Sequence, residues 1–172
     1  MIRIRPARLS EAAELATLHV DTWRKTYRDL APPKALAKLD VAHRLPVWRK
    51  TLSPAGSSKH TLVAVKDKKI AGLISFGSPT NPAFGDSAEI KHLYVDPSNK
   101  RQAVGRRLMV AAFDQLMQDG FQSAALAVVR GNDAALKFYF ALGGVQMGCF
   151  TDAGPIWKSD NNIIKWDPVE IS

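Results

Sequence analysis

Residues 93–109 read Leu-Tyr-Val-Asp-Pro-Ser-Asn-Lys-Arg-Gln-Ala-Val-Gly-Arg-Arg-Leu-Met, an apolar strand, a short polar turn and then a glycine with basic neighbours at the start of a helix. The first four backbone N–H groups of a helix have no partner inside it, and the aligned peptide dipoles place about +0.5 charge at that end. Lys100, Arg101 and Arg106 add positive charge at the same point. This stretch therefore predicts a strand–turn–helix unit that can receive a pyrophosphate group.

Length and composition favour a single domain spanning residues 1–172. Apolar residues make up 46% of the chain and charged residues 23%, and the longest apolar runs, 108–113 and 124–129, are too short to cross a bilayer. The N-terminus has no apolar signal region, and one cysteine cannot form an intrachain disulfide. We therefore expect a cytoplasmic protein without a membrane-spanning helix.

The net charge of +8 favours an anionic partner: nucleic acid, a membrane surface or a phosphorylated small molecule. The basic residues are scattered through the chain without a block of five or more. This argues against a nucleic-acid-binding tail and against a polybasic membrane segment. We expect no nucleic acid and no membrane among the partners, which leaves the phosphorylated small molecule.

Hydrophobic periodicity and turn residues predict alternating strands and helices. Ser10 is a suitable N-cap for a first helix, and Pro32 and Pro33 separate it from a second helix within 34–52. The expected strands are 2–5, 61–65, 70–76, 88–95, 123–129, 145–150 and 156–166, the later helices are 104–118 and 132–142, and loops fill 53–58 and 77–86.

This order of elements predicts an α/β (α+β) fold, a mixed sheet with helices on its faces. In such sheets ligands bind where neighbouring strands open at their carboxyl ends. The turn before Gly105 lies at such a position. We expect the strand through Val95 to separate from the strand through Val129, which makes a cleft between them.

A second motif follows at 132–144, Asn-Asp-Ala-Ala-Leu-Lys-Phe-Tyr-Phe-Ala-Leu-Gly-Gly. Together with the segment 100–105 and the order of elements over nearly the whole chain, it resembles the GCN5-related N-acetyltransferase family. That family has the pattern Asn, two residues, Ala, two residues, Phe-Tyr, three residues, Gly. In the turn the family has Gln or Arg, two residues, Gly, one residue, Gly or Ala, where this chain has Lys100 and Ala103 at the first two positions.

The resemblance implies a fold of the acyl-CoA N-acyltransferase type, with a mostly antiparallel central sheet flanked by helices. It implies acetyl-CoA as the acetyl donor and an amine acceptor that attacks directly in a ternary complex. Amides and basic side chains of the turn would hold the pyrophosphate, and the preceding strand would pair with the pantetheine arm. The expected cofactor-binding residues are Leu93, Tyr94, Val95, Lys100, Arg101, Gln102, Ala103, Val104, Gly105, Arg106, Asn132 and Phe138. Family members often pair their last strands across subunits, so a homodimer is a further expectation.

Acetyl transfer needs a base and a proton donor, because an alkyl amine with a pKa of about 10.4 is protonated at neutral pH and a thiolate must leave. Tyr139 occupies the position that the resemblance assigns to the general acid, and a packed helix aromatic is the alternative. Glu89 is the best candidate for the base, acting through a water, and a solvated or ion-paired residue is the alternative. His92 is a second candidate that otherwise packs against a helix.

Strict alternation divides the strand 88–95 between two faces. It places Glu89, Lys91, Leu93 and Val95 on one face and Ile90, His92 and Tyr94 on the other, unless a bulge intervenes. In the turn, a left-handed backbone at Ala103 would cost roughly 1 kcal/mol and weaken cofactor binding.

His19, Trp23 and Tyr27 recur every four residues and form a stripe on the first helix. Core packing explains such a stripe, but the resemblance implies that this helix walls the acceptor side, where Trp23 and Tyr27 contact the amine substrate. Cys149 is expected to be a buried small hydrophobe. The histidines and the cysteine show no metal-ligand spacing, so we expect no metal. A non-catalytic acyl-CoA-binding module and a basic nucleic-acid-binding domain are the alternative functions.

Overall fold

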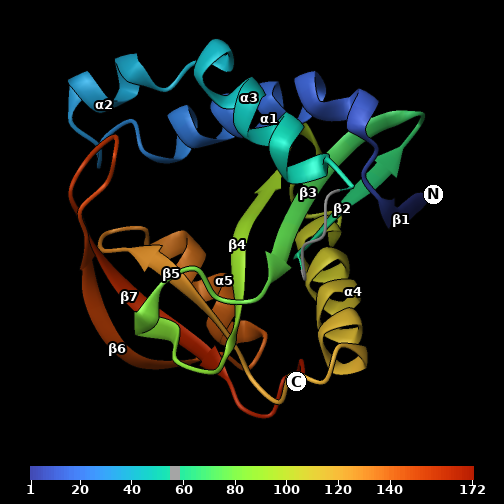
Figure 1. Ribbon diagram of the computed structural model, residues 1–172, viewed down its shortest axis with the longest axis vertical. Coiled ribbons are helices and arrows are strands. Elements are labelled where there is room, and N and C mark those ends of the chain that lie inside the picture. The colour runs from blue at the N-terminus through green and yellow to red at the C-terminus, as the bar shows by residue number, and fades with distance from the viewer. Residues whose placement is uncertain (55–58) are drawn as a thin grey trace.

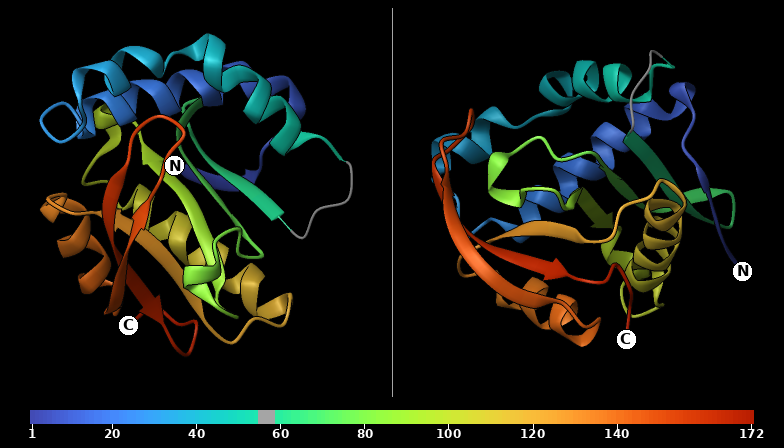
Figure 2. Two further views of the ribbon diagram at one scale, coloured as in Figure 1. Left: turned by 60° about the vertical axis from the view of Figure 1, so that its left-hand side comes forward. Right: turned by 60° about the horizontal axis from the view of Figure 1, so that its bottom comes forward.

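The computed structural model describes residues 1–54 and 59–172, so most of the loop expected at 53–58 lies outside the described residues. The described chain forms a seven-stranded sheet with the order β1-β2-β3-β4-β5-β7-β6. Helices α1, α2 and α3 lie over one face, and α4 and α5 lie over the other (Figures 1 and 2). Every strand pair is antiparallel except β4 with β5. This arrangement confirms the predicted fold class.

The element bounds follow the predicted order. The strands are β1 (Ile2–Pro6), β2 (Lys59–Lys66), β3 (Lys69–Gly77), β4 (Ala88–Val95), β5 (Ala124–Val129), β6 (Val145–Asp152) and β7 (Ser159–Trp166). The helices are α1 (Ala12–Thr26), α2 (Pro33–Lys38), α3 (Val41–Leu52), α4 (Val104–Gln118) and α5 (Asp133–Ala141), with 3-10 turns η1 (Leu9–Glu11), η2 (Pro82–Phe84) and η3 (Pro97–Asn99). Within the described ranges, no helix has the length and hydropathy needed to span a membrane.

The β2–β3 hairpin closes through Asp67 and Lys68, whose φ angles of 48° and 66° are both left-handed. Two central residues with positive φ are typical of the turns that match the natural twist of a hairpin. β1 pairs only with β2 in the sheet order, so Pro6 lies on an edge strand, where its missing N–H is tolerated. The hairpin and the edge position agree with the prediction.

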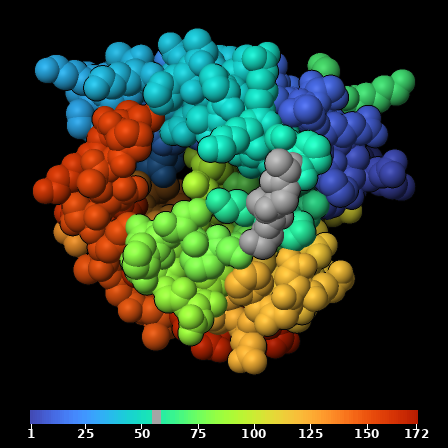
Figure 3. Space-filling view, viewed as in Figure 1, coloured from blue at the N-terminus to red at the C-terminus, as the bar shows by residue number. Residues whose placement is uncertain are grey.

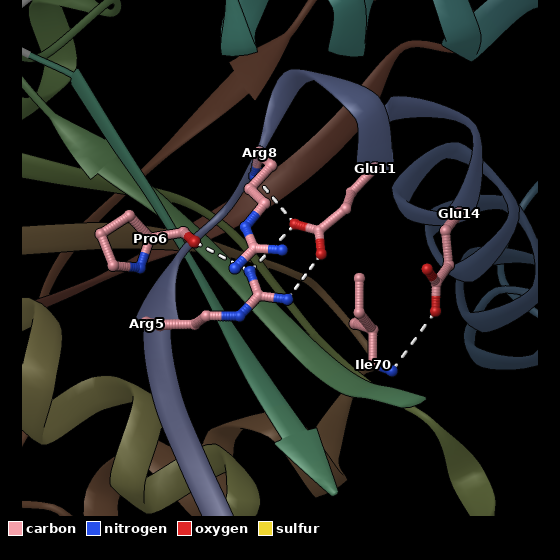
Figure 4. Close-up of polar contacts among 6 residues, drawn as sticks. All are labelled: Arg5, Pro6, Arg8, Glu11, Glu14 and Ile70. Carbon is pink, nitrogen blue, oxygen red and sulfur yellow. Dashed lines mark hydrogen bonds and ion pairs between the residues drawn. The ribbon is translucent and has the colours of Figure 1, made fainter. Parts of the chain in front are cut away.

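The first helix begins differently from the prediction, because Ser10 lies within the turn η1 and does not cap it. The carboxylate of Glu11 accepts a hydrogen bond from the backbone N–H of Arg8 at 2.8 Å and pairs with the guanidinium of Arg5 at 2.6 Å (Figure 4). The hydrogen bond from Arg5 holds the pKa of Glu11 below its usual value. Glu14 accepts from the N–H of Ile70 at 3.3 Å, which ties α1 to the start of β3.

The single helix expected within 34–52 is two helices. The backbone is extended at Leu39, and Asp40 begins α3 by accepting a hydrogen bond from the N–H of His43 at 2.7 Å. An aspartate with this bond is a strong N-cap and starts a new helix rather than continuing the old one.

β4 and β5 part from each other, as predicted. Their pairing consists of Ala88 with Ala124 and Glu89 with Ala125, and beyond these pairs the two strands diverge (Figure 1). Consequently, the β5-facing edge of β4 has no strand partner after Glu89 within the described chain. Unpaired backbone of this kind can accept an extended ligand as an added strand.

A bulge in β4 overturns the strict alternation of its side chains. Ser75 pairs with His92 and Phe76 with Ile90, which leaves Lys91 as the extra residue. Ile90 packs in the core beneath α4 together with Leu93 and Val95, so it lies on their face and not on that of His92. The bulge therefore moves Glu89 to the face of His92, beneath α3.

The C-terminal strands bring two further corrections. β6 is the outer strand and is uncovered, so Cys149 is exposed rather than buried. The strand expected at 156–166 begins at Ser159, which places Trp157 in the β6–β7 connection.

Candidate functional site

Three tyrosines from three elements come together at the gap between β4 and β5. Tyr27 directly follows α1, Tyr94 comes from β4 and Tyr139 from α5. Burial raises the pKa of all three hydroxyls, and repulsion from Tyr27 raises the pKa of Tyr94 and Tyr139 further. Tyr94 packs against the cluster that includes α1, and Tyr139 packs against the cluster that includes α4. All three phenols are protonated at neutral pH and can donate hydrogen bonds.

Tyr139 is half-buried, and its ring lies 5.2 Å from the ring of Phe138 and 5.9 Å from that of Trp166. The ring of Tyr139 therefore packs in the core, which agrees with the alternative interpretation of a packed helix aromatic. Repulsion from Tyr139 is among the smaller causes that raise the pKa of Tyr94, after burial and repulsion from Tyr27. Packing of the ring and donation by the hydroxyl are compatible in one side chain.

Asn132 starts α5, where its Oδ1 accepts a hydrogen bond from the N–H of Ala135 at 3.4 Å. A hydrogen bond between its side chain and the Tyr27 hydroxyl works against the effect of burial on the pKa of Tyr27. Asn132 therefore joins α5 to α1 across the open end of the sheet. Its contact with a cofactor stays a prediction.

The turn before α4 presents unpaired amides. The N–H of Arg107 donates to the carbonyl of Ala103 at 3.0 Å, and the amides of residues 101–106 find no backbone acceptor among the described residues. Arg101 and Ala103 have φ angles of 64° and 58°, so two residues with side chains hold the left-handed conformation that glycine favours. Ala103 therefore has the left-handed backbone for which we expected a cost of roughly 1 kcal/mol.

Lys66 adds a cation to this turn that the sequence analysis did not find. Its Nζ donates to the Oε1 of Gln102 at 2.6 Å. Lys66 closes β2, so a residue 36 positions earlier in the chain reaches the turn through the hairpin. This contact depends on how the end of β2 lies beside the turn, which the sequence pattern does not define.

Gly105 and Phe138, both expected near the cofactor, contact each other. A Cβ on Gly105 would lie 3.1 Å from the Cζ of Phe138 and 3.7 Å from the Cγ2 of Val95. The glycine thus lets the first turn of α4 approach α5 and the end of β4. This close approach brings the turn and the second motif into one site.

Glu89 and His92 line the same pocket, which has a volume of about 130 Å³ and lies beneath α3. Glu89 is 8% exposed, and its Oε2 accepts hydrogen bonds from the N–H of Thr80 at 3.0 Å and from its hydroxyl at 2.7 Å. Glu89 therefore supplies a carboxylate on the face of the sheet that lies opposite α4. Among the described residues that line it, Glu89 is the single carboxylate.

His92 belongs to a buried aromatic cluster with His19, Trp48 and Tyr94, with ring centroids 4.6–5.9 Å apart. The Nε1–H of Trp48 donates to the Nδ1 of His19 at 3.2 Å, and the Nδ1 of His92 lies 2.7 Å from the hydroxyl of Ser75. Burial, followed by repulsion from Lys91 and Arg44, lowers the pKa of His92 to about 3. His92 packs against the helices, as the alternative expected, and is a weak base.

A cluster of three aromatic rings joins the end of α1 to the β6–β7 connection. Trp23 and Tyr27 lie 4.9 Å apart, and Trp157 from the β6–β7 connection contacts both at 5.8 and 5.6 Å. Figure 3 shows a hollow here between the helical layer, the β3–β4 segment in green and the β6–β7 connection in red. The sequence did not indicate Trp157 as a site residue, because its only feature was a position within the strand expected at 156–166.

The open sheet, with a helix N-terminus on one side and a polar pocket on the other, matches the fold of solved N-acetyltransferases. The PaiA N-acetyltransferase from Thermoplasma acidophilum, solved with coenzyme A, superimposes with a TM-score of 0.80 at 19% identity, covering 97% of this chain and 99% of that one. The putative acetyltransferase YncA from Salmonella typhimurium, solved with acetyl-CoA, gives 0.72 at 18% identity, covering 100% and 96%. These likenesses identify the fold.

Sequence comparison gives the family. The model of the Acetyltransferase (GNAT) family matches residues 14–143. The uncharacterized N-acetyltransferase YuaI from Bacillus subtilis is 30% identical over 142 residues, which is 82% of this chain and 79% of that protein. The chain belongs to the GNAT acetyltransferase family, as its motifs predicted.

Proposed function

We propose that this chain is an acetyl-CoA-dependent N-acetyltransferase in which an amine attacks the thioester directly in a ternary complex. The main observation behind the proposal is that β4–β5 pairing ends at Glu89, which leaves the rest of the β5-facing edge of β4 unpaired. Membership of the family, and structural neighbours solved with coenzyme A or acetyl-CoA, support the same cofactor here.

The cofactor would enter from the side of α4. The amides before Arg107 face its pyrophosphate, and Lys66, Lys100, Arg101 and Arg106 add positive charge. The pantetheine arm would pair with the free edge of β4 along residues 93–95. This path leads the thioester to the gap beside the three tyrosines.

The proposed reaction has a balanced transfer of protons. Glu89, acting through a water, takes the proton of the attacking amine, whose nitrogen forms a bond to the acetyl carbon. A backbone N–H of β4, at Leu93 or Val95, stabilises the oxyanion of the tetrahedral intermediate. The bond from carbon to sulfur then breaks, and Tyr139 donates its hydroxyl proton to the leaving thiolate.

The surroundings favour Glu89 over His92 as the base. With its pKa lowered to about 3, His92 is neutral at pH 7 but has little affinity for an ammonium proton. Glu89 is held in place by Thr80 and lines the pocket beneath α3, and it is also the last residue of β4 that pairs with β5. Trp23 and Tyr27, with Trp157, would form the wall against which the acceptor lies.

The test is release of coenzyme A thiol from acetyl-CoA with a panel of amines. In Tyr139→Phe, kcat is expected to fall at least 100-fold, because proton transfer by a positioned group contributes about 10²–10⁴-fold. The dissociation constant for coenzyme A, measured by calorimetry, is expected to stay within twofold. Phe140→Leu, an exposed change on the same helix, serves as the matched control with wild-type turnover.

Two outcomes would contradict the proposal. Full turnover in Tyr139→Phe removes this residue from the chemistry. Tight binding of coenzyme A, combined with no thiol release for any amine, would instead favour the non-catalytic acyl-CoA-binding module.

A further inference from the structure

The pocket beside Glu89 carries an excess of positive charge. Arg44 from α3, Lys59 from β2 and Lys91 from the bulge of β4 line it together with Glu89. The carboxylate of Glu89 is already hydrogen-bonded by Thr80. The pocket thus offers cations that the described protein does not neutralise.

Arg44 is the cation with the clearest unmet requirement. Its Nε is buried and makes no hydrogen bond in the described structure, and among residues 1–54 and 59–172 no carboxylate forms an ion pair with this guanidinium. Burial lowers the pKa of Arg44, and its charge lowers the pKa of both His19 and His92. An unpaired guanidinium in a partly buried position is costly, and an anion in the pocket would remove that cost.

Resting on the proposed function, we propose that the acceptor amine also carries an anionic group, a carboxylate or a phosphate, which Arg44 binds while the amino group lies beside Glu89. A guanidinium presents a planar fork of donors that matches the oxygens of either group. The pocket volume of about 130 Å³ accommodates a group of this size but not a long chain. Amino acids and aminoalkyl phosphates fit this description, whereas polyamines would meet repulsion from Arg44, Lys59 and Lys91.

The substrate test compares amines that differ only in the anionic group. Glycine and O-phosphoethanolamine are compared with ethanolamine, and longer amino acids with their amino alcohols, with spermidine as the polycation. The expected kcat/KM is at least tenfold higher for the anionic member of each pair, the range that charge-assisted hydrogen bonds give. The better of the carboxylate and phosphate arms identifies the group that the pocket prefers.

The variant test isolates Arg44. Arg44→Gln is expected to raise KM for the preferred anionic amine at least tenfold and to leave the matched amino alcohol within twofold, while Arg44→Lys recovers part of the loss. Arg49→Gln, an exposed arginine on the same helix, serves as the control with wild-type values. Because the guanidinium is unpaired, Arg44→Gln is expected to keep or raise the melting temperature, which confirms that the variant folds.

Calorimetric titration of the same anionic amines provides a readout that does not depend on turnover. Binding to the wild type and at least tenfold weaker binding to Arg44→Gln support the inference. Equal or better use of neutral amines or spermidine, an equal effect of Arg44→Gln on all amines, or no binding of any anionic amine overturns it. Failure of coenzyme A to bind contradicts the proposed function instead.

Discussion

Acidification is expected to destabilise the protein because two imidazoles, His19 of α1 and His92 of β4, are held neutral in a packed cluster. His19 is 1% exposed, and burial lowers its pKa to about 2, while the pKa of His92 is lowered to about 3. In the unfolded chain both groups have a pKa of about 6.5. Below pH 6.5 the unfolded state therefore binds more protons than the folded state, and the free energy of unfolding decreases as the pH falls.

Each imidazole is expected to cost roughly 1.4 kcal/mol for every pH unit below 6.5 until its folded pKa is reached, or about 2 kcal/mol at pH 5. Urea unfolding at pH 7.5 and pH 5.0 measures the sum, about 4 kcal/mol for the two groups. His92→Asn keeps a polar group near Ser75 and removes one titration, so its loss between the two pH values should be about 2 kcal/mol smaller than that of the wild type. His43→Asn, an exposed change on α3, serves as the control that retains the wild-type loss. A loss in His92→Asn as large as in the wild type would refute the reasoning.

Two predictions concern the turn before α4. Ala103→Gly is expected to raise the free energy of unfolding, measured with urea, by up to about 1 kcal/mol, because glycine accepts the φ of 58° without strain. The control Ala111→Gly, within α4, should lower the free energy of unfolding. A decrease in Ala103→Gly would contradict the proposed strain. Gly105→Ala is expected to lower the free energy of unfolding by about 1 kcal/mol, because its Cβ would lie 3.1 Å from the Cζ of Phe138. Adding Phe138→Leu should recover the loss, and the absence of recovery would point to another cause.

The parts of the fold that depend on local pattern were predictable. The bounds of α4 and β4 follow from the apolar run, the Asp-Pro turn and the glycines that end the next segments. The second motif placed α5 and Tyr139 because helix periodicity and the Asn132 cap are encoded within ten residues. The separation of β4 from β5 followed from the order of elements.

Features that depend on contacts between distant segments were not predictable. The face on which Glu89 lies depends on the extra residue at Lys91, which only pairing with β3 defines. Trp157 and Arg44 reach the site from a loop and from a helix with no motif of their own. Ser10 is not the cap because it lies inside the 3-10 turn Leu9–Glu11 that precedes α1, a turn that the cap preference alone does not include.

The separation of β4 from β5 also has a mechanical consequence. It divides the sheet into two halves, β1–β4 and β5 with β7 and β6, which in the described chain share strand pairing at only two residue pairs. An extended ligand in the opening would contact both halves of the sheet, so its binding would restrict the movement of one half relative to the other. Amide hydrogen exchange along residues 90–95 should then slow when the opening is occupied, at the positions whose amides point to the unpaired edge.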